Sequence, residues 1–197
     1  MPDGKDEDMA LTTERSAVDD ARATRLRRVA LGADHEGHQL KDKLVAELRE
    51  ERHTAKEHGV LGGGLSEAAD PADIVSIVAQ AVLMGEAELA VVVCGSGAAA
   101  SILANKIPGI RAASCQDTVS ARDARQIADA NMLCLSARVL GPDLASEIVR
   151  VWLASEFSGN ERHQRLLLKI EELEDGFDVR RRHPRRAATP SAGHADS

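Results

Sequence analysis

The chain has 197 residues and a net charge of −7, and 43% of its residues are apolar but only 2% aromatic. This length predicts one domain with tails, and the apolar fraction suffices for a core of Ala, Val, Leu and Ile. The acidic charge and the scarcity of aromatic rings argue against nucleic acid or an anionic membrane as the main partner. The apolar runs are too short to span a bilayer, and the acidic N-terminus lacks the apolar segment of a secretory signal.

The three cysteines, Cys94, Cys115 and Cys134, lie far apart in the sequence. This spacing is typical neither of a disulfide framework nor of a Cys-x-x-Cys zinc site. We therefore expect a reduced, cytoplasmic protein without a metal site.

Composition divides the chain into three parts. Residues 1–26 are polar and aperiodic, so we expect a flexible leader. Residues 27–175 are expected to form the domain, and residues 176–197, basic and then rich in Ala, Ser and Pro, a disordered tail. The RRRHPRR run in this tail could contact nucleic acid or a partner, but a solvated tail fits the acidic body better.

Strand and helix patterns alternate through the domain. In chain order we expect a strand at 27–34, a helix at 36–51, a strand at 53–60, a helix at 71–84, a strand at 88–94, a helix at 97–106, a strand at 109–115, a helix at 118–130, a strand at 131–136, and helices at 142–155 and 161–173. Ser158 and Glu161 have the spacing of a capping box for the last helix. The alternation predicts an α/β fold with a doubly wound parallel sheet.

Ligands of such sheets bind outside the carboxyl ends of the strands. The polar residues expected there are Asp34, His35, Cys94, Ser96, Gln116, Asp117 and Arg138.

The segment CGSGAAA, residues 94–100, has more than one interpretation. Gly95-x-Gly97-x-x-Ala100 follows a strand and opens a helix, and Asp117 lies about 20 residues further on, as a dinucleotide site requires. However, the segment follows a late strand, and a Cys before the first Gly has no role in pyrophosphate binding.

A catalytic interpretation starts from Cys94 itself. A thiol at the amino end of a helix is expected to have a pKa below its usual value of about 8.5. The amides of residues 95–99 would then stabilise an oxyanion formed beside it. The alternative is a small buried apolar Cys, which is the interpretation we prefer for Cys115 and Cys134.

Five motifs in one order resemble a known family: GADHEGHQLK (32–41), CGSGAAASILANKIPGIRA (94–112), SARDARQIADANML (120–133), SARVLG (136–141) and ERHQR (161–165). Together they resemble the type B ribose-5-phosphate isomerases and galactose-6-phosphate isomerase subunits, over about residues 28–173. The resemblance implies a Rossmann-like three-layer α/β/α fold with a mostly parallel five-stranded sheet. It also implies aldose–ketose isomerisation of a sugar phosphate, no metal or dinucleotide, and a homodimer or larger assembly with active sites between subunits.

The resemblance also implies a role for each matching residue. Cys94 stands where the base of a cis-enediolate mechanism stands, and Ser96 where a Thr or Ser assists proton movement. The substrate-binding positions are Asp34 for sugar hydroxyls, His35, Arg138 and Arg162 for the phosphate, and Gly95, Ser96 and Gly97 for the anion hole.

The chain departs from the family pattern at a few positions. Ile127 replaces the ring-opening His, and Ala128 replaces a sugar-binding Asn. Ala99 occupies a loop position that is normally Gly, which would be costly if that position needed a positive φ. The second phosphate arginine, Arg165, has moved from i+4 to i+3 after Arg162, although both positions share one helix face.

These departures leave several hypotheses open. A tetrose 4-phosphate cannot close a furanose, so an isomerase for such a sugar needs no ring-opening His, although galactose-6-phosphate isomerase subunits can also lack it. The alternatives are a non-catalytic sugar-phosphate-binding relative, a subunit of a heteromeric isomerase and a dinucleotide-binding oxidoreductase. The retained base and anion hole favour the isomerase.

Overall fold

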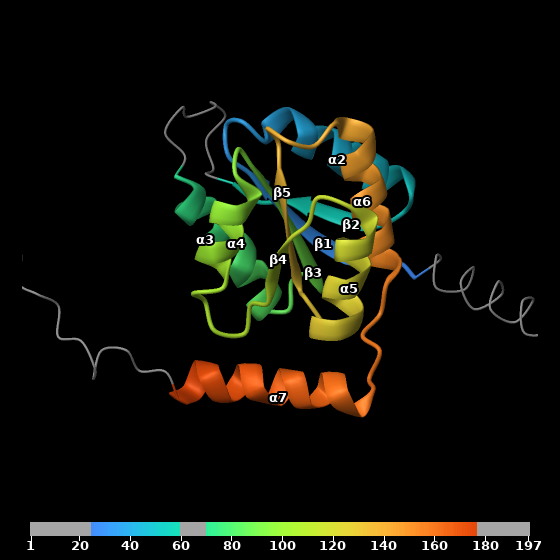
Figure 1. Ribbon diagram of the computed structural model, residues 1–197. Helices are drawn as coiled ribbons and strands as arrows, with labels where there is room; N and C mark the ends of the chain where they lie inside the picture. The colour runs from blue at the N-terminus through green and yellow to red at the C-terminus, as the bar shows by residue number, and fades with distance from the viewer. Residues whose placement is uncertain (1–24, 60–69, 177–197) are drawn as a thin grey trace, which may run out of the picture.

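The computed structural model describes residues 25–59 and 70–176, so most of the expected leader, the expected tail and residues 60–69 lie outside it. The elements in chain order are β1 (Arg28–Ala33), α2 (His38–Glu50), β2 (Thr54–Glu57), α3 (Pro71–Leu83), β3 (Leu89–Cys94), α4 (Gly97–Ala104), β4 (Ala112–Ser114), α5 (Thr118–Ala128), β5 (Met132–Ser136), α6 (Pro142–Ala154) and α7 (Glu161–Gly176). The five strands form one parallel sheet, as predicted, and their order is β2-β1-β3-β5-β4 (Figure 1).

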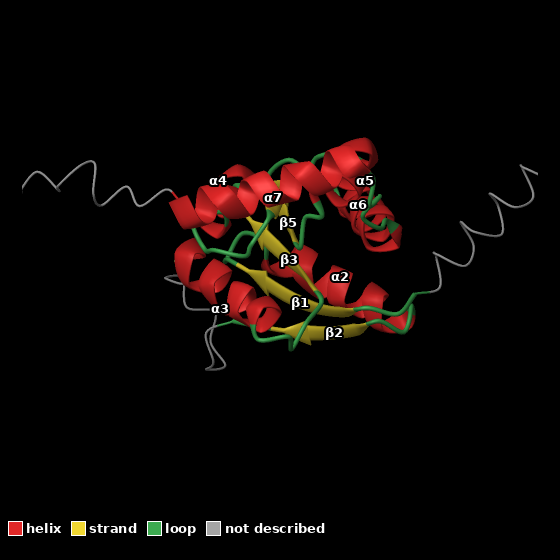
Figure 2. Ribbon diagram, turned by 90° about the horizontal axis from the view of Figure 1, so that it is seen from below, coloured by secondary structure: helices red, strands yellow, loops and turns green. Residues whose placement is uncertain are grey.

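Helices cover both faces of the sheet and make three layers (Figure 2). Alternate residues of a strand point to opposite faces, so each face has its own apolar core. Helices α2, α5 and α6 pack on one face, where Trp152 is fully buried. Helices α3 and α4 pack on the other face, which also takes the side chains of Cys94 and Cys134. The central strand β3 is buried along its whole length, as expected for a strand covered on both sides.

Strand β4 is shorter than the predicted strand at 109–115. Only three of its residues pair with β5, because Gly109 turns the chain at a φ of +83°. The amide of Arg111 then donates to the side chain of Asn131 (2.8 Å) instead of to a neighbouring strand. Strand β4 pairs only with β5 and is the short edge strand of the sheet, followed by α5.

Helix α7 lies apart from the three layers and contains no buried residue (Figure 1). It is longer than predicted, and the expected capping box is wrong. The amide of His163 donates to Oδ1 of Asn160 (2.9 Å), so Asn160 caps the helix. Ser158 lies before the helix, where its amide donates to the carbonyl of Gln126 (3.1 Å). The start of α7 is thereby held against the carboxyl end of α5.

None of the helices in the described ranges is long and apolar enough to cross a membrane.

Candidate active site

Three neighbouring strands bring most of the predicted site residues together. In the sheet register Ala33 pairs with Val93, and Cys94 pairs with Ser136, so β1, β3 and β5 end at the same edge. The loops that follow them carry Asp34 and His35, Ser96, and Arg138. This carboxyl edge is where ligands of parallel α/β sheets bind.

Asp34 ties two of these loops together. Its Oδ1 accepts from the amide of Gly37 (2.9 Å), and its Oδ2 accepts from the amide of Gly95 (2.9 Å). The Asp34 amide donates to the carbonyl of Val93 (3.2 Å). The carboxylate is thus held at a set position beside the end of β3.

Cys94 is the last residue of β3, and its residue surface is only 1% exposed. Burial, followed by the negative charge of Asp34, raises the pKa of its thiol to about 12. Our expectation of a lowered pKa was therefore wrong. The thiol belongs to the sheet and contacts a carboxylate, while helix α4 begins only at Gly97.

Cys115 and Cys134 are buried as predicted, and burial raises the pKa of both thiols.

The loop after Cys94 leaves several backbone amides available. Ser96 caps α4, with its Oγ accepting from the amide of Ala99 (3.3 Å). Within the described residues, the amides of Ser96, Gly97 and Ala98 make no hydrogen bond. These N–H groups at the amino end of a helix are suited to an anion.

Two details of this loop differ from the sequence expectations. The amide of Gly95, expected in the anion hole, is already bonded to Asp34. Ala99 lies in helix α4 and has no positive φ, so alanine costs no backbone strain there.

An ion pair not predicted from the sequence spans the site. Nε of Arg138 donates to Oε2 of Glu36 (2.6 Å), and Nη2 donates to Oε1. The hydrogen bond from Arg138 lowers the pKa of the Glu36 carboxyl, and the same bond raises the pKa of Arg138. Glu36 and the preceding His35 are both exposed. Nothing in the sequence indicates which cation an exposed glutamate pairs with.

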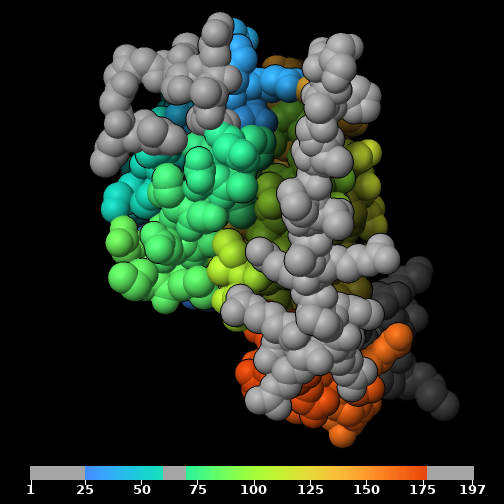
Figure 3. All heavy atoms as spheres, turned by 90° about the vertical axis from the view of Figure 1, so that its left-hand side faces the viewer, coloured from blue at the N-terminus to red at the C-terminus, as the bar shows by residue number. Residues whose placement is uncertain are grey.

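Arg162, Arg165 and Ile127, by contrast, lie at the opposite edge of the sheet. Arg162 and Arg165 are exposed on α7, where Arg165 pairs with Glu161 (3.1 Å). Ile127 is near the end of α5, next to the start of α7. Helix α7 lies at one end of the molecule and the segment after β1 at the other, in orange and blue respectively (Figures 1 and 3). A single chain therefore does not bring Arg162, Arg165 or Ile127 to Cys94.

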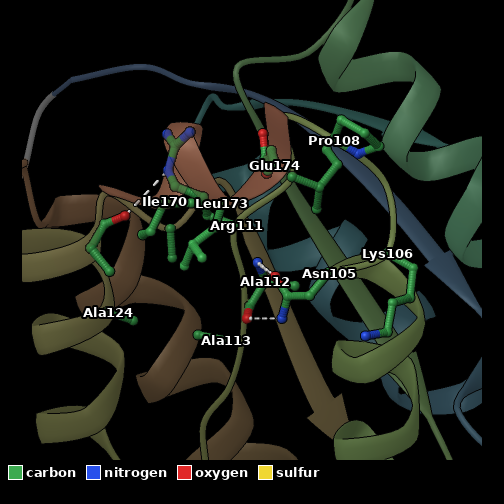
Figure 4. A pocket seen from close by; sticks show the side chains of 13 residues that line it. Asn105, Lys106, Pro108, Arg111, Ala112, Ala113, Ala124, Ile170, Leu173 and Glu174 are labelled. Atoms are coloured by element: carbon green, nitrogen blue, oxygen red, sulfur yellow. Dashed lines mark hydrogen bonds between the residues drawn. The ribbon is translucent and has the colours of Figure 1, made fainter. Parts of the chain in front are cut away.

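Two cavities lie at the surface of the described residues, and Cys94 is not among the residues that line them. A cavity of about 820 Å³ lies between α7 and the region where α4, β4 and α5 meet, with Arg111 and Leu173 in its wall (Figure 4). A cavity of about 400 Å³ lies at the carboxyl edge and is lined by Glu36, Gln39, Leu40, Lys43, Ala137, Leu140 and Pro142. Within the described ranges, no group of three or more His, Cys, Asp or Glu side chains is placed to hold a metal.

The family model described as Ribose/Galactose Isomerase matches residues 29–170. The chain belongs to the ribose/galactose isomerase family. It is therefore an isomerase with a Rossmann-like fold, and the Gly95–Ala100 segment lies within the matched residues.

Individual members support the same assignment. This isomerase is 38% identical to ribose-5-phosphate isomerase B of Escherichia coli, over 72% of this chain and 93% of that protein. It is 37% identical to D-erythrulose-4-phosphate isomerase of Pectobacterium atrosepticum, over 66% of this chain and 85% of that protein. The structure of the Trypanosoma brucei type B ribose 5-phosphate isomerase matches with a TM-score of 0.69 and 42% identity, over 75% of this chain and 98% of that one.

Proposed function

We propose that this isomerase interconverts the aldose and ketose forms of a phosphorylated sugar at the carboxyl edge of its sheet. The observation that supports this most is that Asp34, the Cys94 thiol and the first amides of α4 lie together, in a chain of this family. A base, a polar hydroxyl-binding group and an anion site are the parts that enolisation needs.

In this mechanism Cys94 is the base. The thiol holds its proton at neutral pH, so it gives that proton up to solvent as the sugar binds. The resulting thiolate takes the proton from C2 of the open-chain aldose and returns it to C1 through a cis-enediolate, while the hydroxyl proton moves from O2 to O1. Its high pKa makes the thiolate a strong base for this carbon-bound proton.

The amides of residues 96–98 stabilise the negative oxygen of the enediolate. The Ser96 hydroxyl accepts from Ala99 and keeps its own hydrogen free to donate, which suits it to assist proton movement.

A complete site requires two copies of the chain. His35 and Arg138 lie at the carboxyl edge, whereas Arg162 and Arg165 lie at the opposite edge on a helix without buried residues. In a symmetric dimer, α7 of one copy is able to present its arginines to the Cys94 loop of the other. Arginine suits this role because its guanidinium binds phosphate oxygens in pairs.

We further propose a substrate that needs no ring opening, such as a tetrose 4-phosphate. Ile127 stands at the position of the family's ring-opening His, and its hydrocarbon side chain, 36% exposed, cannot transfer a proton. A tetrose 4-phosphate cannot form a furanose because its O4 is esterified. Relatives of similar identity bear both names, D-erythrulose-4-phosphate isomerase at 37% and ribose-5-phosphate isomerase B at 38%, so the choice of a tetrose phosphate rests on Ile127.

One experiment tests the mechanism and the substrate together. The full chain is incubated in D₂O with four-, five- and six-carbon aldose and ketose phosphates, and deuterium incorporation at C1 and C2 is followed by NMR. We expect faster exchange with tetrulose phosphate than with ribose 5-phosphate. In Cys94→Ala exchange should fall at least about 1000-fold, with little change in sugar-phosphate affinity. Cys134→Ala, which removes an equally buried thiol, is the control and should retain exchange.

Unchanged exchange in Cys94→Ala would exclude the thiol as the base. A ribose phosphate that reacts faster than the tetruloses would exclude the tetrose proposal. Binding without exchange for every sugar would instead favour a non-catalytic relative or one subunit of a heteromeric isomerase.

A further inference from the structure

The Glu36 carboxylate lies between Arg138 and the loop that follows Cys94. It binds Arg138 through two hydrogen bonds, on the Nε and Nη2 edge of the guanidinium. The two residues follow β1 and β5, which are separated in the sheet by β3. The pair therefore passes over the end of β3, where the Cys94 loop begins.

The carboxylate also lies directly against that loop. A Cβ built on Gly95 would meet Oε1, Cδ and Oε2 of Glu36 at 2.6, 2.7 and 2.8 Å. The Glu36 carboxylate therefore fills the space where a side chain at position 95 would begin. A negative group already occupies the space between Arg138 and the loop whose next amides, at Ser96 and Gly97, make no hydrogen bond within the described residues.

Glu36 is able to leave this position without moving the backbone. The turn is held by the bond from the Gly37 amide to Asp34, whereas the Glu36 side chain is 43% exposed. The 400 Å³ cavity beside it gives a displaced carboxylate room to move, and Lys43 in its wall already pairs with Asp143 at 2.8 Å. Both partners are exposed, so water screens their attraction and can take over their hydrogen bonds when the pair opens.

We propose that Glu36 is a built-in competitor for Arg138, so that an incoming phosphate group must exchange with the Glu36 carboxylate and Glu36 thereby sets the affinity of the site for anions. The inference rests on the proposed function only for naming the phosphate of a sugar as the natural anion. It makes Glu36 a specificity-determining residue, with no part in the proton transfer.

The charges explain why Glu36 opposes anion binding. The Glu36–Arg138 pair has no net charge, and the donors on the Nε edge of the guanidinium are already used. A phosphate that approaches meets the negative carboxylate first, at short range. Removing the carboxylate leaves a free cation and an uncovered loop.

Binding of inorganic phosphate to the full chain tests the proposal without any isomerase assay. Affinity is measured by calorimetry at constant ionic strength for the natural chain, Glu36→Gln and Glu36→Ala. We expect phosphate to bind about three- to tenfold more tightly to both variants, as for removal of an exposed competing pair. Adding Arg138→Gln to either variant should abolish the gain, because the competition is for that guanidinium.

Glu86→Gln is the matched control. Glu86 is also an exposed glutamate in an ion pair, with Lys56 at 2.8 Å, but it lies in the turn between α3 and β3. It changes the net charge by the same amount and should leave phosphate affinity unchanged.

Equal or weaker phosphate binding in the Glu36 variants would overturn the proposal, and weaker binding would mean that Glu36 orients Arg138 for the anion. Absence of phosphate binding in every variant would overturn it too. In either case deuterium exchange in the natural chain would leave the proposed function standing. Tighter binding in the Glu36 variants of a chain that catalyses no exchange would support the competitor and reject only the enzyme.

Discussion

Cys94 shows how far a single residue can be interpreted from its sequence neighbours. The Cys-Gly-x-Gly pattern before a helix predicts a thiol in positive potential. In the structure the thiol is the buried end of β3 and contacts Asp34, and both burial and the carboxylate favour the neutral form. The thiol therefore keeps its proton at neutral pH, and the base proposed above must be activated by substrate binding.

Alkylation of Cys94 should report this raised pKa. With a pKa of about 12, the thiolate fraction grows about tenfold per pH unit throughout the range 7 to 10. We expect the rate of iodoacetamide labelling of Cys94, followed by peptide mass spectrometry, to rise over this whole range without a plateau. The urea-unfolded chain is the control, because its thiols should level off above their ordinary pKa of about 8.5. A plateau near that value in the folded protein would contradict the raised pKa.

At the scale of elements, close approach rather than unusual backbone angles explains the glycines of the site. Gly37 and Gly97 have no positive φ. A Cβ on Gly37 would lie 2.0 Å from the carbonyl oxygen of Val93, and one on Gly97 would lie 3.0 Å from the backbone of β5. The turn after β1 and the start of α4 are thus pressed against neighbouring strands, which holds the loops of the site in place.

Gly37→Ala should destabilise the fold for this reason. The Cβ would push the turn away from β3, and we expect a loss of about 1–3 kcal/mol in the free energy of unfolding, measured by urea titration. Gly59→Ala is the control, because a Cβ there meets nothing within 4 Å. Equal stability of the two variants would show that the turn relaxes freely.

At the scale of the whole molecule, the candidate site is divided between two edges of one sheet. Asp34 and Cys94 are at the carboxyl edge, and Arg162 on α7 is at the other. Helix α7 exposes Leu168 and Leu173, each more than half exposed, which are costly to leave in water. Both features fit a symmetric assembly in which α7 serves the neighbouring copy.

Mixing two inactive variants tests this arrangement. Cys94→Ala and Arg162→Ala should each be nearly inactive alone if each complete site takes Cys94 from one copy and Arg162 from another. After joint unfolding and refolding, half of the dimers are mixed and one of their two sites is intact, so about a quarter of the natural activity should return. A mixture of Cys94→Ala with Cys94→Ser is the control and should recover nothing. No recovery in the first mixture would mean that both residues act within one chain.

The sequence by itself determined the order and type of the elements and the residues at the carboxyl edge. These follow from local periodicity, since alternating strand and helix patterns favour a parallel sheet covered by helices on both faces. The family motifs likewise predicted the isomerase.

Only the tertiary structure decided what surrounds each of these residues. Three features join residues that are far apart in the chain: the burial of Cys94 beside Asp34, the bond from Gly95 to Asp34, and the Glu36–Arg138 pair. The position of α7 at the opposite edge also came only from the structure. Such contacts depend on how strands and helices pack, and no local pattern encodes that packing.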